Sequence, residues 1–272
     1  MAEVRAALVA AARALEAVSD TPRLDAELLM AQALGCERDA LLLRHLRDPE
    51  PAGFAALLAR RVSGEPIAYI AGTRDFWTIR LAVGPGALIP RADSETLIEA
   101  AVAHFRGTPG PRRILDLGTG PGTLLLAALA EWPAASGLGI DASAAALDYA
   151  RANAAALGAA AEFRLGDWAA GIDERFDLAL ANPPYIALDD GDVAADVRAF
   201  EPAEALFAGE DGLAAYRAIV PELPRLIAPG GVAVLEIGWR QGEAVAAMVA
   251  AAGLRPRIAN DLGNRPRAVF AT

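Results

Sequence analysis

The sequence predicts an α/β fold, in which strands alternate with helices to build a largely parallel sheet, preceded by a small helical domain. Three observations support this prediction. A glycine-rich turn follows an apolar run near residue 117, acidic residues end three successive predicted strands, and residues 1–73 carry helical patterns. Alternating strands and helices are typical of doubly wound sheets, which bind ligands outside the carboxyl ends of their strands. We therefore expect the functional site at that edge.

Residues 1–73 are expected to form a domain of packed helices. One helical face is indicated by apolar residues at spacings of four and three, namely Val4, Leu8, Ala11, Leu15 and Val18. A second helix is expected to begin at Pro22 after a Thr21 cap, Asp39 to cap a third, and Pro51 to open a fourth. Such a domain either only packs or recognises a substrate, and both interpretations stand.

Residues 74–90 are predicted to form a β-hairpin linker, and residues 91–272 an α/β domain. Strands are predicted at 114–117, 135–140, 161–165, 176–181, 231–237, 255–259 and 267–271, which gives a seven-stranded sheet. Helices are predicted at 124–132, at 144–157 with Ser143 as its cap, at 212–227 with a break at Pro221 and Pro224, and at 241–252. The polar connection 186–210 is expected to fold over the site as a lid.

The glycine-rich turn reads Gly118-Thr-Gly-Pro-Gly122 and follows a strand that contains Asp116. Glycines at such a turn let the backbone come close to a ligand. A dinucleotide site is the obvious competitor. Two details argue against it, because the spacing is not Gly-x-Gly-x-x-Gly and because Asp116 would repel a pyrophosphate. The same carboxylate would attract a cationic amino acid.

Two further acidic residues end the next predicted strands. Asp141 follows the second strand, where a carboxylate can accept hydrogen bonds from two ribose hydroxyls. Asp167 and Trp168 follow the third strand, where they can bind an exocyclic amine and cover an adenine ring. Any one of these acids alone would be an ordinary solvated residue. Three of them at successive strand ends indicate one nucleoside-type site.

The sequence Asn182-Pro-Pro-Tyr185 ends the apolar run 176–181. The prolines stop the strand and hold Asn182 in extended geometry at its carboxyl edge. The side-chain oxygen of Asn182 and the carbonyl of Pro183 are two acceptors for the two hydrogens of a planar NH2 group. Tyr185 offers a flat face to cover a flat substrate group. The alternative is a proline turn that merely ends the strand.

Together these motifs resemble the class I S-adenosylmethionine-dependent methyltransferases, which have a Rossmann-like, seven-stranded fold. Asn182-Pro-Pro-Tyr185 resembles their amino-methylating branch, whose acceptors are adenine N6, cytosine N4 or glutamine N5. The motif therefore indicates the acceptor atom and leaves open the molecule that carries it.

Several stretches outside the core motifs resemble the PrmC/HemK family of release factor glutamine methyltransferases. They are 64–72, 88–95, 201–206, 211–217 and 235–238, and the resemblance extends from about residue 20 to the end. It is strongest at Ile89-Pro-Arg91 and at 182–185. The family usually has Arg-Pro-Glu/Asp-Thr-Glu where this chain has Arg91-Ala-Asp-Ser-Glu95, and Ser or Ala in place of Pro121.

The resemblance implies S-adenosylmethionine as methyl donor, S-adenosylhomocysteine as product, and the glutamine of a Gly-Gly-Gln motif in peptide-chain release factors as acceptor. It further implies the following sites. The methionine part of the cofactor is approached by Asp116, Gly118, Thr119, Gly120, Pro121 and Gly122. Asp141 binds the ribose, and adenine is flanked by Asp167 and Trp168. Asn182 lies between cofactor and substrate, and the glutamine site is completed by Pro183, Pro184 and Tyr185.

The composition limits the alternatives. A net charge of −10 and a pI near 4.8 disfavour tight, non-specific nucleic-acid binding, which depends on neutralising phosphates. One cysteine, Cys36, excludes an intrachain disulfide, and with two histidines we expect no metal centre. No apolar span reaches about 20 residues free of charges and no signal peptide is visible, so we expect a cytoplasmic monomer without membrane contact.

Three competing functions remain. A glutamine methyltransferase for a ribosomal protein would share the fold and the site. An adenine-N6 methyltransferase acting on nucleic acid would share the motif but is disfavoured by the acidic balance. A cofactor-binding module without activity is disfavoured by the complete Asn-Pro-Pro-Tyr sequence.

Overall fold

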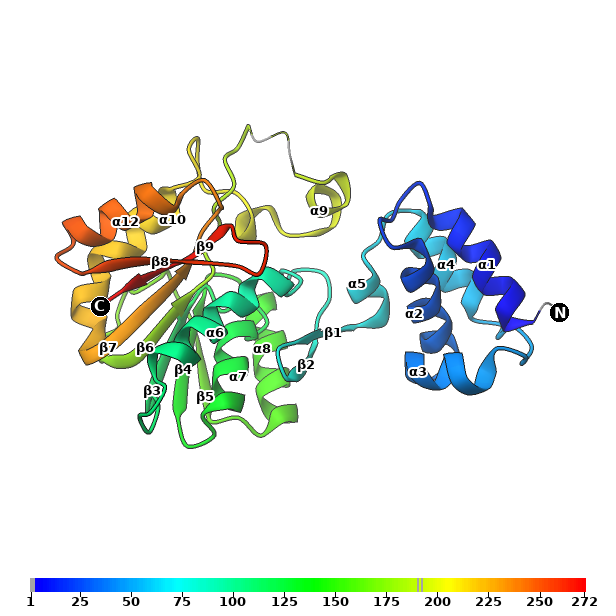
Figure 1. Ribbon diagram of the computed structural model, residues 1–272, viewed down its shortest axis with the longest axis horizontal. Helices are drawn as coiled ribbons and strands as arrows, with labels where there is room; N and C mark the ends of the chain where they lie inside the picture. Colours follow the sequence, from blue (N-terminus) through cyan, green and yellow to red (C-terminus); the bar gives the residue numbers. More distant parts are fainter. Residues whose placement is uncertain (1–2, 190, 192) are drawn as a thin grey trace. The chain divides into compact units, whose positions relative to one another are not determined.

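The computed structural model describes residues 3–189, 191 and 193–272. It divides into two compact units (Figure 1). The helical unit comprises residues 1–73 together with 194–200, and the sheet unit comprises 74–193 and 201–272. Two residues of the predicted lid, 190 and 192, lie outside the described part of the chain. Among the described residues, no helix is both long and apolar enough to cross a membrane.

The helical unit contains six helices in its described residues: α1 (Val4–Leu15), α2 (Pro22–Leu34), α3 (Arg38–Ala40), α4 (Phe54–Val62), α5 (Ile67–Ala71) and α9 (Ala195–Phe200), with a π-helical turn over Leu41–His45. Its core is built from apolar side chains of these helices, among them Leu8, Leu15, Leu29, Met30, Leu41, Phe54 and Ile70. A buried ion pair joins Arg61 to Asp25 at 2.8 Å, and Arg61 also donates to the Val18 carbonyl. A buried charge is tolerated because it is paired and hydrogen-bonded.

Two predicted helix starts in this unit are wrong. Asp39 lies inside α3, whose cap is Glu37, because the extended backbone at Glu37 places the first turn two residues earlier. Residues 51–53 form a turn and α4 begins at Phe54, with Gly53 as its cap. The start of α2 at Pro22 after Thr21 is confirmed, although the Thr21 hydroxyl bonds Asp25 at 3.3 Å and makes no capping bond.

A two-stranded hairpin, β1 (Thr73–Phe76) and β2 (Ile79–Ala82), follows α5. Trp77 at its turn has φ 54° and is held by two glutamates: its backbone N–H donates to Glu95 at 2.8 Å and its indole N–H to Glu131 at 2.6 Å. At the other end, Asn153 binds both the N–H and the carbonyl of Ala82. The hairpin is therefore fixed to the sheet unit by side chains far away in the sequence.

The sheet unit is built around a seven-stranded sheet of order β5-β4-β3-β6-β7-β9-β8. Its strands are β3 (Arg113–Leu117), β4 (Ser136–Asp141), β5 (Ala161–Leu165), β6 (Phe176–Ala181), β7 (Ile227–Glu236), β8 (Pro256–Asn260) and β9 (Pro266–Ala271). Neighbouring strands from β5 to β7 pair in parallel, whereas β9 is antiparallel to both β7 and β8. The predicted α/β class and the seven-stranded sheet are confirmed.

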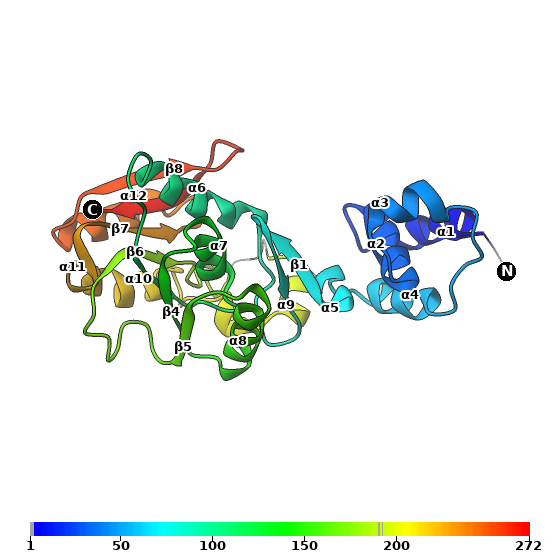
Figure 2. The ribbon, with the colours of Figure 1, turned by 90° about the horizontal axis from the view of Figure 1, so that it is seen from below.

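Helices cover the sheet. The helices α6 (Glu95–His104), α7 (Thr123–Glu131) and α8 (Ala144–Leu157) pack in sequence, and α7 and α8 lie side by side in both views (Figures 1 and 2). The other group is α10 (Ala214–Ile219), α11 (Leu223–Leu226) and α12 (Gly242–Ala251), whose buried side chains share one core with the inner faces of β3, β6, β7 and β9.

Local signals explain several boundaries. Ser143 caps α8, as predicted, by accepting a hydrogen bond from the Ala146 N–H at 3.2 Å. The predicted break near Pro221 and Pro224 is also present, because a short 3-10 turn over Val220–Glu222 separates α10 from α11. A proline cannot donate the helical N–H bond, so the regular ladder stops there.

Candidate active site

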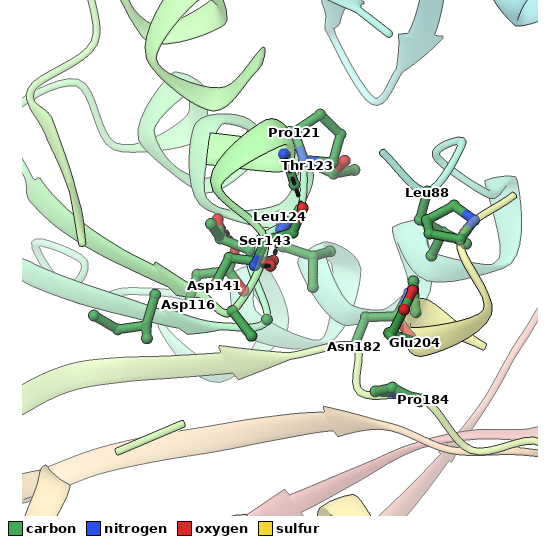
Figure 3. A pocket seen from close by; sticks show the side chains of 18 of the residues that line it. Leu88, Asp116, Pro121, Thr123, Leu124, Asp141, Ser143, Asn182, Pro184 and Glu204 are labelled. Atoms are coloured by element: carbon green, nitrogen blue, oxygen red, sulfur yellow. Dashed lines mark hydrogen bonds between the residues drawn. The ribbon is translucent and has the colours of Figure 1, made fainter. Parts of the chain in front are cut away.

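A cavity of about 460 Å³ lies at the carboxyl ends of β3, β4, β5 and β6, where the fold predicts a ligand site. Most of the residues predicted for the site line it: Asp116, Gly118, Thr119, Gly120, Pro121, Asp141, Asp167, Trp168, Asn182 and Pro184. Figure 3 shows Asp141 and Pro121 on one side of the cavity and Asn182, Pro184 and Leu88 across from them. Elements far apart in the sequence thus meet at one edge.

Three predicted residues do not line this cavity. Gly122 has φ 87° and begins α7, and a β-carbon there would meet a Leu126 methyl at 2.8 Å. The missing side chain of Gly122 therefore serves helix packing, and its approach to the cofactor stays a prediction. Pro183 is buried, and Tyr185 packs against the main core. Their part in holding a substrate amide remains a prediction.

Asp116 is 1% exposed at the floor of the cavity. Its Oδ2 accepts hydrogen bonds from the Thr119 hydroxyl at 2.7 Å and the Leu125 N–H at 3.2 Å. Its Oδ1 has no partner among the described residues. Burial raises the pKa of this carboxyl to about 7, the bonds from Thr119 and Leu125 lower it, and the charge of Asp141 raises it slightly. A cationic ligand group would satisfy the free oxygen.

Asp141 ends β4 and ties the glycine turn (residues 118–122) in place. Its Oδ2 accepts the Gly120 N–H at 2.7 Å, and its Oδ1 accepts the Ser143 N–H at 2.8 Å. A carboxylate has about four acceptor positions, so each oxygen keeps a lone pair for a hydroxyl donor. The N–H groups of Gly118 and Thr119 both donate to the Ile140 carbonyl and hold the turn against the end of β4.

Asp167 is exposed and lines the cavity beside Trp168. Trp168 adopts φ 46°, a left-handed conformation that costs a bulky residue roughly 1–3 kcal/mol. Its ring covers Gly118, where a β-carbon would lie 3.3 Å from the indole. Gly118 is therefore needed for the close approach of the ring, and the indole forms part of the cavity wall.

Asn182 lies at the end of β6 and faces the cavity. Its Nδ2 donates to the Ser94 hydroxyl at 3.1 Å. Because the amide nitrogen is engaged by Ser94, the carbonyl oxygen Oδ1 is the atom available to a substrate. An acceptor in this position suits an NH2 donor.

The sequence analysis missed the buried groups behind Asn182. Glu236, at the end of β7, is 1% exposed and lies within hydrogen-bond distance of the Tyr185 hydroxyl, at 3.3 Å. Gln241 donates to the Tyr185 carbonyl at 2.9 Å and fixes the loop from its other side. The available signal was a glutamate within the apolar run 231–237, since a carboxylate is rarely buried without a specific partner.

A third residue that the sequence analysis missed as a site residue lies beside the cavity on the side of Leu88. Glu201 is 6% exposed, and its Oε1 pairs with the Arg91 guanidinium at 2.5 Å while its Oε2 accepts the Ile89 N–H at 3.1 Å. This carboxylate links the residues before α6 to the segment that follows the Asn-Pro-Pro-Tyr loop (residues 182–185). Ile89, Arg91 and Pro202 all line the cavity, so the ion pair shapes its wall.

The donor set fits S-adenosylmethionine. A buried carboxylate oxygen that no described residue bonds matches its ammonium group, and a second carboxylate with free lone pairs matches its ribose diol. An exposed carboxylate beside an indole matches the adenine amine and ring. Each of these matches uses a different strand end of the same sheet.

Solved structures show the same fold. The chain aligns with the ribosomal protein L11 methylase of Lactobacillus delbrueckii subsp. bulgaricus at a TM-score of 0.50 and 20% identity, covering 69% of this chain and 82% of that one. A methyltransferase from Pyrococcus furiosus aligns at a TM-score of 0.51 and 15% identity, covering 70% and 87%. These similarities establish a methyltransferase fold.

Sequence comparisons define the family. Residues 6–72 match the PrmC N-terminal domain, and residues 94–210 match the methyltransferase small domain. Release factor glutamine methyltransferases from Cereibacter sphaeroides and Caulobacter vibrioides are 48% and 41% identical to this chain, covering 91% and 98% of it and 90% and 95% of their own lengths. The homologue from Rhodospirillum rubrum is 44% identical over 93% of the chain. The chain belongs to the family of release factor glutamine methyltransferases.

Proposed function

We propose that this enzyme transfers a methyl group from S-adenosylmethionine to the side-chain nitrogen N5 of the glutamine in the Gly-Gly-Gln motif of peptide-chain release factors. Relatives that are 41% to 48% identical over more than nine tenths of the chain are named release factor glutamine methyltransferases. The observation in the structure that best supports the proposal is the engaged amide nitrogen of Asn182, which leaves an acceptor for the substrate NH2 at the cavity. S-adenosylhomocysteine is the second product.

Different residues of the cavity bind different parts of the cofactor. Asp116 holds the ammonium group, Asp141 the ribose hydroxyls, and Asp167 with Trp168 the adenine. When bound, the cofactor supplies a methyl group on a positively charged sulfur. The glycine turn brings backbone close to it without side chains in the way.

The residues of the Asn-Pro-Pro-Tyr loop orient the acceptor. An amide nitrogen is a poor nucleophile because its lone pair is delocalised into the carbonyl. Hydrogen bonds from its two hydrogens to Asn182 Oδ1 and the Pro183 carbonyl fix its direction and favour a more pyramidal nitrogen. Such positioning and electrostatic stabilisation lower the barrier without a strong base, and the proton leaves after methylation has raised its acidity.

The domains have separate tasks in this proposal. Residues 1–73 recognise the release factor, residues 74–90 form a linker, and residues 91–272 carry the chemistry. The match of 6–72 to a domain of its own supports the division. The enzyme acts as a monomer in the cytoplasm, where release factors work, and requires neither nucleic acid nor membrane.

Mass spectrometry of the Gly-Gly-Gln peptide tests the function. The purified enzyme, S-adenosylmethionine and an unmodified release factor should give a mass increase of one methyl group on the glutamine. A release factor with alanine at that position, a ribosomal protein fraction and adenine-containing DNA serve as parallel acceptors. Methylation of another acceptor, with the release factor left unmodified, would refute the proposal.

A further inference from the structure

The Asn-Pro-Pro-Tyr loop has no backbone donor in its middle. Pro183 and Pro184 carry no N–H, so neither can be fixed by a hydrogen bond that its own backbone donates. At the cavity end of the loop, Asn182 donates to the Ser94 hydroxyl at 3.1 Å. The direction of the Pro183 carbonyl therefore depends on how firmly the other end of the loop, at Tyr185, is fixed.

The other end of the loop is held by the side chain of Gln241. Its Nε2 donates to the Tyr185 carbonyl at 2.9 Å and to the Gly212 carbonyl at 3.2 Å. Its Oε1 accepts the Gly238 N–H at 3.0 Å. A backbone carbonyl can only accept and a backbone N–H can only donate, so these three partners allow one orientation of the amide. The Gln241 carboxamide thus joins three segments that lie apart in the sequence.

Two glycines leave room for this arrangement. A β-carbon at Gly212 would overlap the Tyr185 carbonyl oxygen and lie 2.8 Å from Gln241 Nε2. A β-carbon at Gly238 would lie 2.9 Å from Gln241 Oε1 and 3.4 Å from the Tyr185 ring. Any larger residue at either position would therefore displace the carboxamide or the end of the loop.

Gln241 is itself fixed by the fold. It occupies the N-cap position of α12, and its own N–H donates to the Gly238 carbonyl at 2.8 Å. Its carbonyl accepts the Val245 N–H at 3.0 Å. Val245 and Val249 of the same helix are fully buried in the core that α12 shares with the sheet. A side chain that starts from such a rigid element holds its partner more precisely than one on a loop.

We propose that Gln241 is a positioning residue for methyl transfer. By holding the Tyr185 carbonyl, it fixes the Asn-Pro-Pro-Tyr loop and keeps the Pro183 carbonyl directed at the substrate amide. Gln241 is not among the described residues that line the cavity, so it acts through the loop. This inference rests on the proposed function, because the Pro183 carbonyl is one of the two acceptors assigned there to the substrate NH2 group.

Two substitutions separate the hydrogen-bond donors of Gln241 from its shape. Gln241→Glu keeps the length and an acceptor for the Gly238 N–H, but its carboxylate places an acceptor against two carbonyls. Gln241→Met keeps the length and makes none of the three bonds. We expect kcat on the release factor to fall about 10- to 100-fold for Gln241→Glu, and less for Gln241→Met, because only the carboxylate repels the Tyr185 carbonyl. Ala244→Glu adds the same charge at an exposed position in the first turn of α12 and should stay close to the parent.

Hydrogen exchange shows whether the loop itself is released. Directly after the loop, the Ile186 N–H donates to the Leu206 carbonyl at 3.0 Å. Exchange in a peptide that spans residues 185–189 should be about tenfold faster in Gln241→Glu than in the parent, whereas the glycine turn should exchange at an unchanged rate. Calorimetry should give a dissociation constant for S-adenosylhomocysteine within about threefold of the parent value, which shows that the variant is folded.

The outcomes are distinct. An unchanged kcat in both Gln241 variants would contradict the inference, and so would a reduced kcat with unchanged exchange at 185–189. Weaker cofactor binding together with faster exchange of the glycine turn would also contradict it, because the damage would then be general. If Gln241→Glu does not fold, Gln241→Met carries the same comparison.

Failure of the parent to methylate the release factor would instead overturn the proposed function. The exchange measurement needs no substrate, so it still tests whether Gln241 holds the loop. An active parent and an active Ala244→Glu protein, together with a slow, folded Gln241→Glu protein whose loop exchanges faster, support both proposals.

Discussion

Two buried carboxyl groups frame the site, and their surroundings give them different tasks. Asp116 lies at the cavity with one oxygen that has no partner among the described residues, whereas Glu236 lies behind the Asn-Pro-Pro-Tyr loop and accepts a hydrogen bond from the Tyr185 hydroxyl. Burial raises the pKa of each to about 7. The Asp116 carboxyl is placed to bind a positively charged group of a ligand, and the Glu236 carboxyl to fix a hydroxyl group of the protein.

Asn182→Ala should abolish methylation of the release factor, because the NH2 group of the substrate loses an acceptor in the cavity. Binding of S-adenosylhomocysteine should weaken by less than about threefold, since Asp116 and Asp141 remain. Single-turnover assays measure the first effect and titration calorimetry the second. Near-normal turnover would show that the loop does not orient the acceptor.

The cofactor affinity should depend on pH through Asp116. Below its pKa of about 7 the carboxyl is neutral in the free protein and must lose a proton before it pairs with an ammonium group. The affinity for S-adenosylhomocysteine should therefore fall as the pH is lowered from 8 to 5, by up to about tenfold per unit below the pKa. Calorimetry at several pH values tests this, with Asp116→Asn as control. Parallel pH profiles for the two proteins would contradict it.

At the scale of elements, the glycine turn both lines the cavity and lets a helix begin, and its sequence does not show which glycine does which. Gly118 and Gly120 line the cavity, whereas Gly122 lets α7 begin in contact with its own next turn. All three have positive φ. A run of glycines therefore predicts the turn and leaves open which member faces the ligand.

Gly122→Ala should destabilise the protein more than Gly158→Ala. Both glycines have positive φ, of 87° and 63°, so either alanine costs about 1 kcal/mol in backbone strain. At Gly158 the space is open, whereas at Gly122 the new carbon meets Leu126 at 2.8 Å and adds about 1–3 kcal/mol. Urea unfolding of the two variants measures the difference. Equal losses would show that α7 shifts to accept the methyl group.

Most helix boundaries were predicted from sequence patterns within a single turn of the chain. The cap at Ser143 and the break after α10 depend on residues within the same turn, and both are confirmed. The start of α3 was missed because Glu37 takes the capping position through its backbone, without the side-chain bond that the sequence pattern assumes. Helix ends set by backbone geometry alone carry little sequence signal.

The site was less predictable than the fold. Strand ends placed Asp116, Asp141 and Asn182 at one edge, because parallel strands bring their carboxyl ends together. Ser94 and Asn182 are separated by 88 positions, and Tyr185 and Glu236 by 51. Contacts at such separations depend on how the helices pack on the sheet, which no local pattern encodes.

At the scale of the whole molecule, Glu236 makes stability depend on pH. Its pKa is raised from 4.5 to about 7 by burial, against the lowering effects of Ser94, Arg267 and Tyr185. The unfolded chain therefore loses its proton first, and stability that is full below 4.5 is lost as the pH rises through 7.

Glu236→Gln removes this loss. Relative to the parent, the variant should gain on the order of 2–3 kcal/mol in the free energy of unfolding between pH 4.5 and pH 8. Urea unfolding at both ends of this range gives the comparison, and subtraction cancels the similar contribution of Asp116. A difference that is the same at both pH values would mean that Glu236 is ionised as easily in the folded protein as in the unfolded chain.

The grouping of α9 has a consequence for how the chain connects the two units. This helix groups with residues 1–73, although the chain on both sides of it belongs to the sheet unit. The backbone consequently passes between the units after residues 73, 193 and 200, which makes three covalent connections. The third connection ends at Glu201, whose carboxylate accepts a hydrogen bond from the Ile89 N–H and pairs with Arg91 beside the cavity. The segment that joins the two units for the third time is therefore bonded, at its first residue in the sheet unit, to the wall of the cavity.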